Sequence, residues 1–283
     1  MVSRTITSIL FTVALGWPSA DALCALITIA GNGPELHAIE QLTRAFEQAH
    51  LGSVVEIRWD ASFHPIHMVK VGEADFAVAG QTDPDLEAIP IAWDGIALVV
   101  DFTNPLKAVT TEQAAAMFSG KVTRWSGLGG PDLAIQLIDR PQNQHIRGTL
   151  EQELGIIGQI PASAKVRQSD QKAISTVAGN TSAVTYVSLG IALEAVTYGV
   201  GVTLLVVDQV EPSKETVKNG HYKLRRPILL LKRKEPHPVA EAFAAFALSN
   251  SGQDIVGDMF VPYRPTDKES GHVAVVPGTV GRR

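Results

Sequence analysis

The stretch "TTEQAAAMFSGKVTRWSGLGGPDLAIQLIDRPQNQHIRGTL", residues 110–150, contains a helix, a strand and the start of a second helix in succession. Thr110 precedes Gln113 by three residues, the spacing of a capping box, which predicts a helix beginning there. The apolar run 133–138 predicts a strand, and the following loop leads into another helix pattern. This order predicts α/β architecture around the segment.

The rest of the chain alternates in the same way. Apolar runs at 26–30, 53–59 and 226–232 predict strands. Between the first two, residues 35–50 carry an apolar stripe at helical spacing, formed by Leu36, Ile39, Leu42 and Phe46. Alternating strands and helices predict an α/β fold with mostly parallel sheets, and 283 residues suffice for one large domain or two smaller ones.

Composition narrows the function classes. The chain is 45% hydrophobic and 19% charged, as in ordinary globular proteins, and its formal net charge is -5. Nucleic acid is therefore not an expected partner. The single cysteine, Cys24, excludes an intramolecular disulfide.

The N-terminus has the order of a secretory signal peptide. Arg4 precedes an apolar run that ends at Leu15, and an Ala-x-Ala site ends at Ala22. We expect cleavage near Ala22 and a periplasmic or secreted protein, with 1–22 as the signal peptide. The alternative is an N-terminal membrane anchor. Cys24 suggests a lipid anchor, but Leu23 before it is larger than the residue a lipoprotein signal normally has.

Five stretches in order resemble the phosphate-binding proteins of bacterial phosphate ABC transporters. They are "IPIAWDGIALVVDFTNP" (89–105), the segment 110–140, "AVTYVSLG" (183–190), "NGHYKLRRPILLLKRKEP" (219–236) and "AFAAFALSNSGQDIV" (242–256). The resemblance spans roughly residues 25–263. It implies a type II periplasmic binding protein fold, an α/β fold in which two domains flank a ligand cleft.

The resemblance also implies a domain division. Domain I would comprise 25–94 and 227–265, and domain II would comprise 95–226. The chain would cross between them near 92–96 and near 224–228, and the domains would close by bending at these crossings. The tail 266–283 lacks a helical period and is expected to be flexible.

Three loops of domain I are expected to reach the cleft. In "GNGPE" (31–35), Asn32 offers an amide and Gly33 allows close backbone approach. Ser62 matches a ligand-binding serine of the family. Where the family has a small or acidic residue that contacts the ligand, often with an arginine nearby, this chain has Gly80 and Gln81.

The fourth loop departs most from the family. The family pattern is R-x-x-G-S-G-T-R, and an ungapped pairing places Arg140 on its first arginine and Arg147 on its last. The Gly-Ser-Gly-Thr cradle is then replaced by Asn143, Gln144, His145 and Ile146. A gapped pairing could use Gly148-Thr149, but it would shift the following helix. The ligand set implied here is Arg140, Gln144, His145 and Arg147, with Arg140 as the main charged contact.

A salt bridge from Arg140 to Asp139, Glu151 or another acidic neighbour is the structural alternative to a ligand contact. His64 and His67 stand three residues apart, a spacing too weak to predict a metal site. No cofactor, metal or catalytic motif is expected, so the chain is not expected to be an enzyme.

The function that follows is a monomeric exported solute-binding protein for phosphate or a related small oxyanion, with an ABC transporter permease as partner. Because the cradle is lost, phosphate is expected to bind weakly. The alternative function is a binding-protein-like domain repurposed as a sensory or interaction module, with a different small ligand or none.

Overall fold

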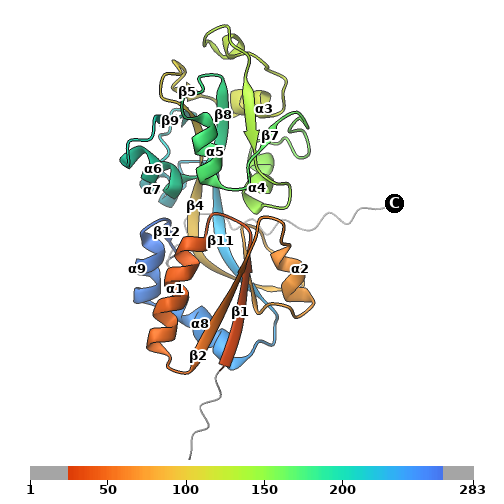
Figure 1. Cartoon of the computed structure of the whole chain (residues 1–283), viewed down its shortest axis with the longest axis vertical. Coiled ribbons are helices and arrows are strands. Elements are labelled where there is room, and N and C mark those ends of the chain that lie inside the picture. Colours follow the sequence, from red (N-terminus) through yellow and green to blue (C-terminus); the bar gives the residue numbers. More distant parts are fainter. Residues whose placement is uncertain (1–24, 264–283) are drawn as a thin grey trace, which may run out of the picture.

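The computed structural model describes residues 25–263 and shows two α/β lobes stacked along the long axis (Figure 1). We call residues 25–94 and 227–263 lobe I, and residues 95–226 lobe II. Buried apolar clusters follow this split closely: one joins residues between Ile96 and Leu224 with Val261, and two others lie within lobe I. The division into two domains stays a prediction, and the expected signal peptide and flexible tail lie outside the described residues.

Lobe I packs the helices α1, α8 and α9 on one side of its strands and the short helix α2 on the other (Figure 1). Its elements are β1 (Ala25–Gly31), α1 (Leu36–Ala49), β2 (Ser53–Trp59), α2 (Pro65–Lys70), β3 (Phe76–Ala79), the first part of β4 (Glu87–Asp101), most of β11 (Arg225–Lys232), α8 (Pro238–Ala247), α9 (Asn250–Gly257) and β12 (Val261–Pro262).

Lobe II contains the second part of β4 and the elements between it and β11. They are β5 (Ala108–Val109), α3 (Thr111–Phe118), the 3-10 helix η1 (Trp125–Leu128), β6 (Gln136–Asp139), α4 (His145–Glu153), β7 (Lys165–Val166), α5 (Asp170–Val177), β8 (Ala183–Ser188), α6 (Leu189–Thr197), β9 (Val202–Leu204), β10 (Val206–Val207) and α7 (Lys214–Lys218).

The main sheet runs through both lobes in the order β2-β1-β3-β11-β4-β8-β6-β7. Pairing is parallel in the outer parts, between β1 and its two neighbours and between β6 and its two neighbours. Pairing is antiparallel around β4 and β11, because the chain enters lobe II along β4 and returns along β11. The α/β prediction is confirmed, whereas the expectation of mostly parallel sheets misses this antiparallel centre.

The two long strands β4 and β11 form the connection between the lobes (Figure 1). In their register Ala92 lies opposite Ile228, and Gly95 lies opposite Arg225. These positions fall within the two crossings expected from the sequence. On one side of the connection, Lys214 Nζ of α7 donates to the backbone oxygen of Asp258, at 2.7 Å, and so ties lobe II to lobe I.

Local sequence explains where the helices of lobe II begin. The Thr110 hydroxyl accepts from Gln113 N, and the Gln113 side chain accepts from Thr110 N, so the expected capping box at α3 is confirmed. For α5 the sequence left Ser169 and Asp170 as candidate caps. Ser169 is the cap, which places Asp170 at the first helical position.

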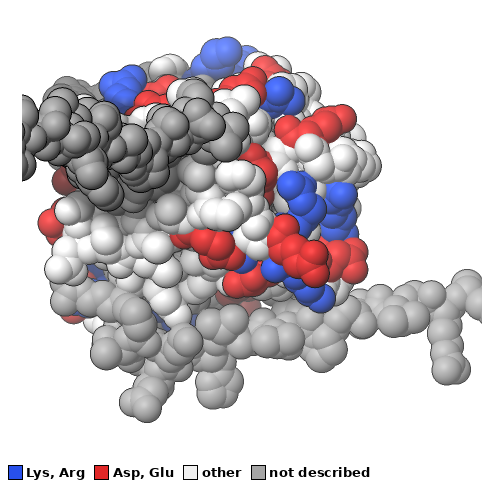
Figure 2. Space-filling view, turned by 90° about the horizontal axis from the view of Figure 1, so that it is seen from below, with Lys and Arg blue, Asp and Glu red and all other residues white. Residues whose placement is uncertain are grey.

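The lower end of the molecule, as Figure 1 is drawn, has a mixed surface charge. Figure 2 views that end and shows acidic and basic side chains interspersed, without a large area of one sign among the residues in colour. Of the helices between residues 25 and 263, none combines the length and the apolar character that crossing a membrane requires.

Candidate interlobe binding site

The loop between β6 and α4 of lobe II lies against the loop between β1 and α1 of lobe I. Asn32 Nδ2 donates to the backbone oxygen of Asn143, at 3.0 Å. Gln144 Nε2 donates to the backbone oxygen of Asn32, at 2.8 Å. The fold thus brings Asn32 and Gln144, two of the predicted site residues, into direct contact across more than a hundred residues of sequence.

Arg140 directly follows β6 and is almost completely buried at this contact. Its Nη2 donates to Gln144 Oε1, at 2.9 Å, and to the backbone oxygen of Gln168, at 3.2 Å. Its Nη1 forms an ion pair with Asp170 at the start of α5. The structural alternative from the sequence is therefore present, with Asp170 as the acidic neighbour rather than Asp139 or Glu151.

Arg147 pairs with acidic side chains of its own lobe. Its Nη1 lies 3.0 Å from Asp139 Oδ2, and its Nε lies 2.9 Å from Glu151 Oε1. Asp139 also accepts from the Tyr186 hydroxyl, at 2.6 Å, and burial raises the pKa of Asp139 above its ordinary value. The charge of Arg147 is thus balanced within lobe II, and within residues 25–263 its side-chain hydrogen bonds and ion pairs all go to groups of that lobe.

His145, the first residue of α4, projects from lobe II between two glycines of lobe I. A Cβ atom built on Gly33 would lie 2.7 Å from His145 Nε2, and one built on Gly80 would lie 2.5 Å from His145 Nδ1. Such distances are too short for a side chain, so both positions need glycine while the imidazole is in place. Burial lowers the pKa of His145, which favours the neutral ring.

Arg226, at the start of β11, contacts the ring of His145 and two carboxylates. Its Nη1 lies 2.6 Å from His145 Nδ1, and its Nη2 donates to Glu35 Oε1, at 2.6 Å, and to Asp94 Oδ2, at 2.8 Å. Because guanidinium only donates, His145 Nδ1 must accept, which places the ring proton on Nε2. That nitrogen lies 3.4 Å from Glu35 Oε2.

The two carboxylates beside Arg226 titrate in opposite directions. Burial raises the pKa of Asp94 to about 6, although Arg226 counteracts part of this effect. Burial also acts to raise the pKa of Glu35, but the charge of Arg226 and the contact with His145 outweigh it and lower that pKa to about 2. Glu35 thus stays ionised at neutral pH, and Asp94 loses its proton close to physiological pH.

We call this group the interlobe cluster, and its charged members are Glu35, Asp94, Arg140, Asp170 and Arg226. Two of its three carboxylates, Glu35 and Asp170, lie at helix N-termini, where unpaired N–H groups and the helix dipole favour an anion, and the third, Asp94, lies in β4. Glu35 is the cap residue of α1, and Asp170 is the first residue of α5 and accepts from Ser188 N at the start of α6. With His145 neutral, three carboxylates face two guanidinium groups, so the cluster has no surplus positive charge.

The other predicted residues lie outside the cluster. Ser62 is exposed, and its hydroxyl donates to Asp60 Oδ1, at 2.6 Å. Gln81 is also exposed. The side chain of Ile146, which the sequence placed at the position of a family hydroxyl, is packed into the apolar core of lobe II.

The sequence reasoning did not assign a ligand role to Glu35, Asp94, Asp170 or Arg226. Arg226 and Asp94 lie in the two predicted crossings, and this position was the only sequence feature that could have indicated their role. A charged residue inside an apolar strand that joins two lobes must be paired when the strand is buried. That pairing requires partners from sequence-distant elements, which the sequence alone does not locate.

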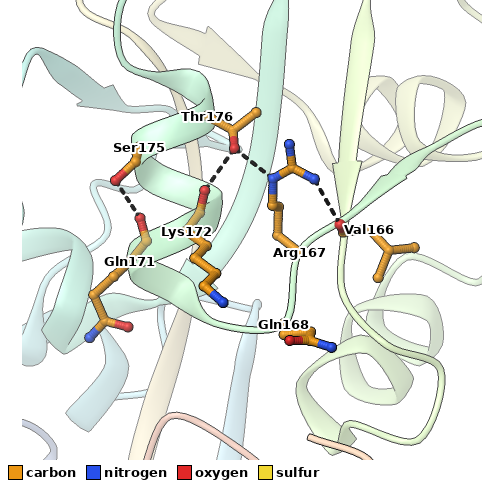
Figure 3. A pocket seen from close by; sticks show the side chains of 7 residues that line it. All are labelled: Val166, Arg167, Gln168, Gln171, Lys172, Ser175 and Thr176. Atoms are coloured by element: carbon orange, nitrogen blue, oxygen red, sulfur yellow. Dashed lines mark hydrogen bonds between the residues drawn. The ribbon is translucent and has the colours of Figure 1, made fainter.

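A separate surface hollow of about 670 Å³ lies beside α5 (Figure 3). It is lined by Val166, Arg167, Gln168, Gln171, Lys172, Ser175 and Thr176. Arg167 there donates to Thr176 Oγ1, at 2.8 Å, and to the backbone oxygen of Val166, at 3.0 Å. No group of three or more His, Cys, Asp or Glu side chains is arranged to hold a metal ion between residues 25 and 263, and His64 and His67 are exposed.

The sequence was compared with a family profile and with known proteins. The profile of the PBP superfamily domain matches residues 18–251. A phosphate-binding protein from Borreliella burgdorferi is 23% identical over 202 residues, which cover 69% of this chain and 71% of the relative. One from Bacillus subtilis is 26% identical over 157 residues, which cover 54% of this chain and 50% of the relative.

Solved structures agree in fold. A structure from Clostridium perfringens, titled as a phosphate ABC transporter substrate-binding protein with bound phosphate, aligns with a TM-score of 0.77 and 27% identity. The alignment covers 84% of this chain and 100% of that chain. A phosphate transport receptor from Vibrio cholerae aligns with a TM-score of 0.74 over the same 84%, and its 24% identity supports the fold alone.

Two α/β lobes joined by paired crossing strands, with helix N-termini meeting between them, define a two-lobe binding protein. This chain belongs to the PBP superfamily. The type II periplasmic binding protein fold and the resemblance to phosphate ABC transporter binding proteins, both expected from the sequence, are confirmed.

Proposed function

We propose that this chain is an exported solute-binding protein for phosphate or a related small oxyanion, acting in ABC-type uptake. The observation that carries the proposal is the meeting of Arg140 and the N-terminus of α4 with the β1–α1 loop across the two lobes. The first N–H groups of a helix have no partner within the helix and favour an anion. The names of the relatives, and the phosphate in the Clostridium perfringens structure, support the same ligand class.

The finer parts of the proposal rest on the sequence. We propose cleavage near Ala22, a periplasmic or secreted location, a monomeric state and a transporter permease as partner. The relatives carry the names of binding proteins, so we propose binding rather than catalysis. The proposed ligand contacts are Asn32, Gly33, Ser62, Gln81, Arg140, Gln144, His145 and Arg147; the exposed positions Ser62 and Gln81 would have to approach the ligand from the cleft entrance.

Phosphate is expected to bind weakly, because the guanidinium of Arg140 is already paired with Asp170. Each charge-assisted hydrogen bond contributes roughly 1.5–3 kcal/mol, and two or three lost bonds lower affinity by several powers of ten. Titration calorimetry with phosphate, sulfate and arsenate tests this directly. Measurable but weak binding supports the proposal, whereas submicromolar phosphate binding contradicts the weak-affinity part of it.

A second function is favoured by a specific observation. Each charged side chain of the interlobe cluster has a partner within the chain, as expected of a binding-protein-like domain that serves as a sensory or interaction module. A thermal-shift panel separates the two functions, because a ligand at 100 times its dissociation constant adds about 2.7 kcal/mol of stability. Stabilisation by an oxyanion supports solute binding, and no shift with any anion or small acid supports the module.

A further inference from the structure

His145 is enclosed by the opposite lobe as a bound molecule would be. Only 8% of its side chain is exposed, although it belongs to the first turn of α4 in lobe II. Two backbone segments of lobe I, at Gly33 and Gly80, flank the ring so closely that neither position leaves room for a Cβ atom. The imidazole therefore fills the space between these two segments of lobe I.

The ring is also bound as a polar ligand would be. Arg226 contributes a hydrogen bond to Nδ1, and Glu35 Oε2 faces Nε2. Glu35 Oε2 is buried and has no hydrogen-bond partner within residues 25–263, so its 3.4 Å approach to Nε2 is an electrostatic contact rather than a hydrogen bond. Both ring nitrogens thus meet complementary groups that come from lobe I and from the crossing strand β11.

The residues before His145 secure the same contact. Asn143 Nδ2 donates to the backbone oxygens of Ala61, at 2.8 Å, and Phe63, at 2.9 Å, which are in lobe I. Gln144 bonds to the backbone oxygen of Asn32 through its Nε2. Lobe II therefore contacts lobe I through three consecutive residues, and these bonds join the two lobes directly.

We propose that Asn143, Gln144 and His145 form an internal plug that occupies the interlobe site, holds the lobes closed without ligand and admits a small anion only when His145 leaves its place between Gly33 and Gly80. The proposal deepens the proposed function, since it makes His145 the residue that sets anion affinity at that site. It also accounts for Gly80, where an added Cβ atom would meet His145, whereas Gly33 is required by Glu35 Oε2 as well as by His145.

Two independent variants remove the plug. His145→Ala deletes the ring, and Gly80→Ala adds a methyl group where the ring lies, at a backbone position without positive φ. The matched controls are His67→Ala, which changes an exposed histidine, and Gly148→Ala, because a Cβ at Gly148 meets nothing within 4 Å. Solution scattering should show a larger radius of gyration for both plug variants, and no change for the controls.

Inorganic phosphate is the probe for affinity. Calorimetry should show at least a tenfold lower dissociation constant for His145→Ala than for the wild type and both controls. Added imidazole should restore the compact radius and raise the melting temperature of His145→Ala selectively, because a cavity shaped by a deleted ring can take up the free ring compound.

The outcomes separate the plug from the proposed function. The plug proposal fails if the plug variants keep the radius of gyration of the wild type and bind phosphate with unchanged affinity. It also fails if the wild type already has the larger radius expected of His145→Ala. Opening and imidazole rescue without phosphate binding in any variant would uphold the plug and overturn the oxyanion function. Tight phosphate binding by the wild type, with no gain on removing His145, would uphold the function and overturn the plug.

Discussion

Gln144 Nε2 in lobe II donates to the backbone oxygen of Asn32 in lobe I, at 2.8 Å, while Gln144 Oε1 accepts from the guanidinium of Arg140. One side chain thus links the interlobe contact to the buried ion pair of lobe II. The Gly-Ser-Gly-Thr loop of the resembled family has a serine at this position, which is too short for both contacts. The altered loop therefore supplies bonds between the lobes in place of an open anion cradle.

Replacing Arg140 should destabilise the protein as well as weaken anion binding. Arg140→Ala leaves Asp170 buried without its partner, a change that typically costs about 3–5 kcal/mol. The control is Arg124→Ala, whose ion pair with Asp132 is exposed and should contribute little to stability. Urea unfolding of both variants measures the difference, and equal losses would show that the Arg140–Asp170 pair is not the buried pair described here.

Because of Asp94, the free energy of unfolding should fall as the pH rises. Its pKa rises from 3.8 in the unfolded chain to about 6 in the folded protein, so the folded state binds more protons between these values. The contribution is complete below about pH 3.8 and is lost as pH rises through about 6, a change of up to about 3 kcal/mol. Asp94→Asn should remove this slope in chemical unfolding measured from pH 4 to 7.

Glu35 should have the opposite effect, so that its contribution to the free energy of unfolding rises with pH. Its folded pKa of about 2 lies below the 4.5 of the unfolded chain, so its contribution is complete above about pH 4.5 and is lost as pH falls through about 2. Glu35→Gln should therefore flatten the acid limb in urea unfolding. Because the charge of Glu35 also helps to raise the pKa of Asp94, the falling limb should move to lower pH in the same variant. An acid limb unchanged by Glu35→Gln would show that Glu35 does not have the lowered pKa described here.

Restoring the family loop should recover phosphate binding only when the core is kept intact. The variant Asn143→Gly/Gln144→Ser/His145→Gly removes the internal contacts and should bind phosphate more tightly than the wild type. Adding Ile146→Thr should give no further affinity and should lower stability, because that side chain is packed in the core of lobe II rather than in the cleft. Calorimetry measures the phosphate affinity of both variants, and thermal unfolding measures their stability. A gain in phosphate affinity from Ile146→Thr would refute the placement of Ile146 in the core.

The lobes should move as rigid bodies about β4 and β11 when the interlobe contact is released. Spin labels at His37→Cys in α1 and Lys172→Cys in α5, both exposed, report across the lobes once Cys24 is replaced by Ser. Electron spin distance measurements should show a longer distance in the triple loop variant than with the native loop, and a shorter one after phosphate is added. A control pair within lobe II, Glu112→Cys and Lys172→Cys, should keep its distance; a shift in that pair would mean that the lobe itself deforms.

The sequence by itself determined the local elements and the family. The capping box at Thr110, the apolar stripe of α1 and the order of the strands depend on neighbouring residues, so periodicity and short motifs suffice to find them. The loss of the glycine and hydroxyl cradle at 143–146 was also visible, because the flanking Arg140 and Arg147 keep the loop in register.

Only the tertiary structure decided which side chains meet between the lobes. Arg226 pairs with Glu35 and Asp94, and Arg140 pairs with Asp170. The partners come from separate elements, and burial forces them to pair because an unpaired buried charge is too costly. The place of His145 between two glycines depends on how closely the lobes approach, a distance that no local pattern encodes. The sequence thus identified a changed anion loop, and packing showed that its own side chain occupies the gap.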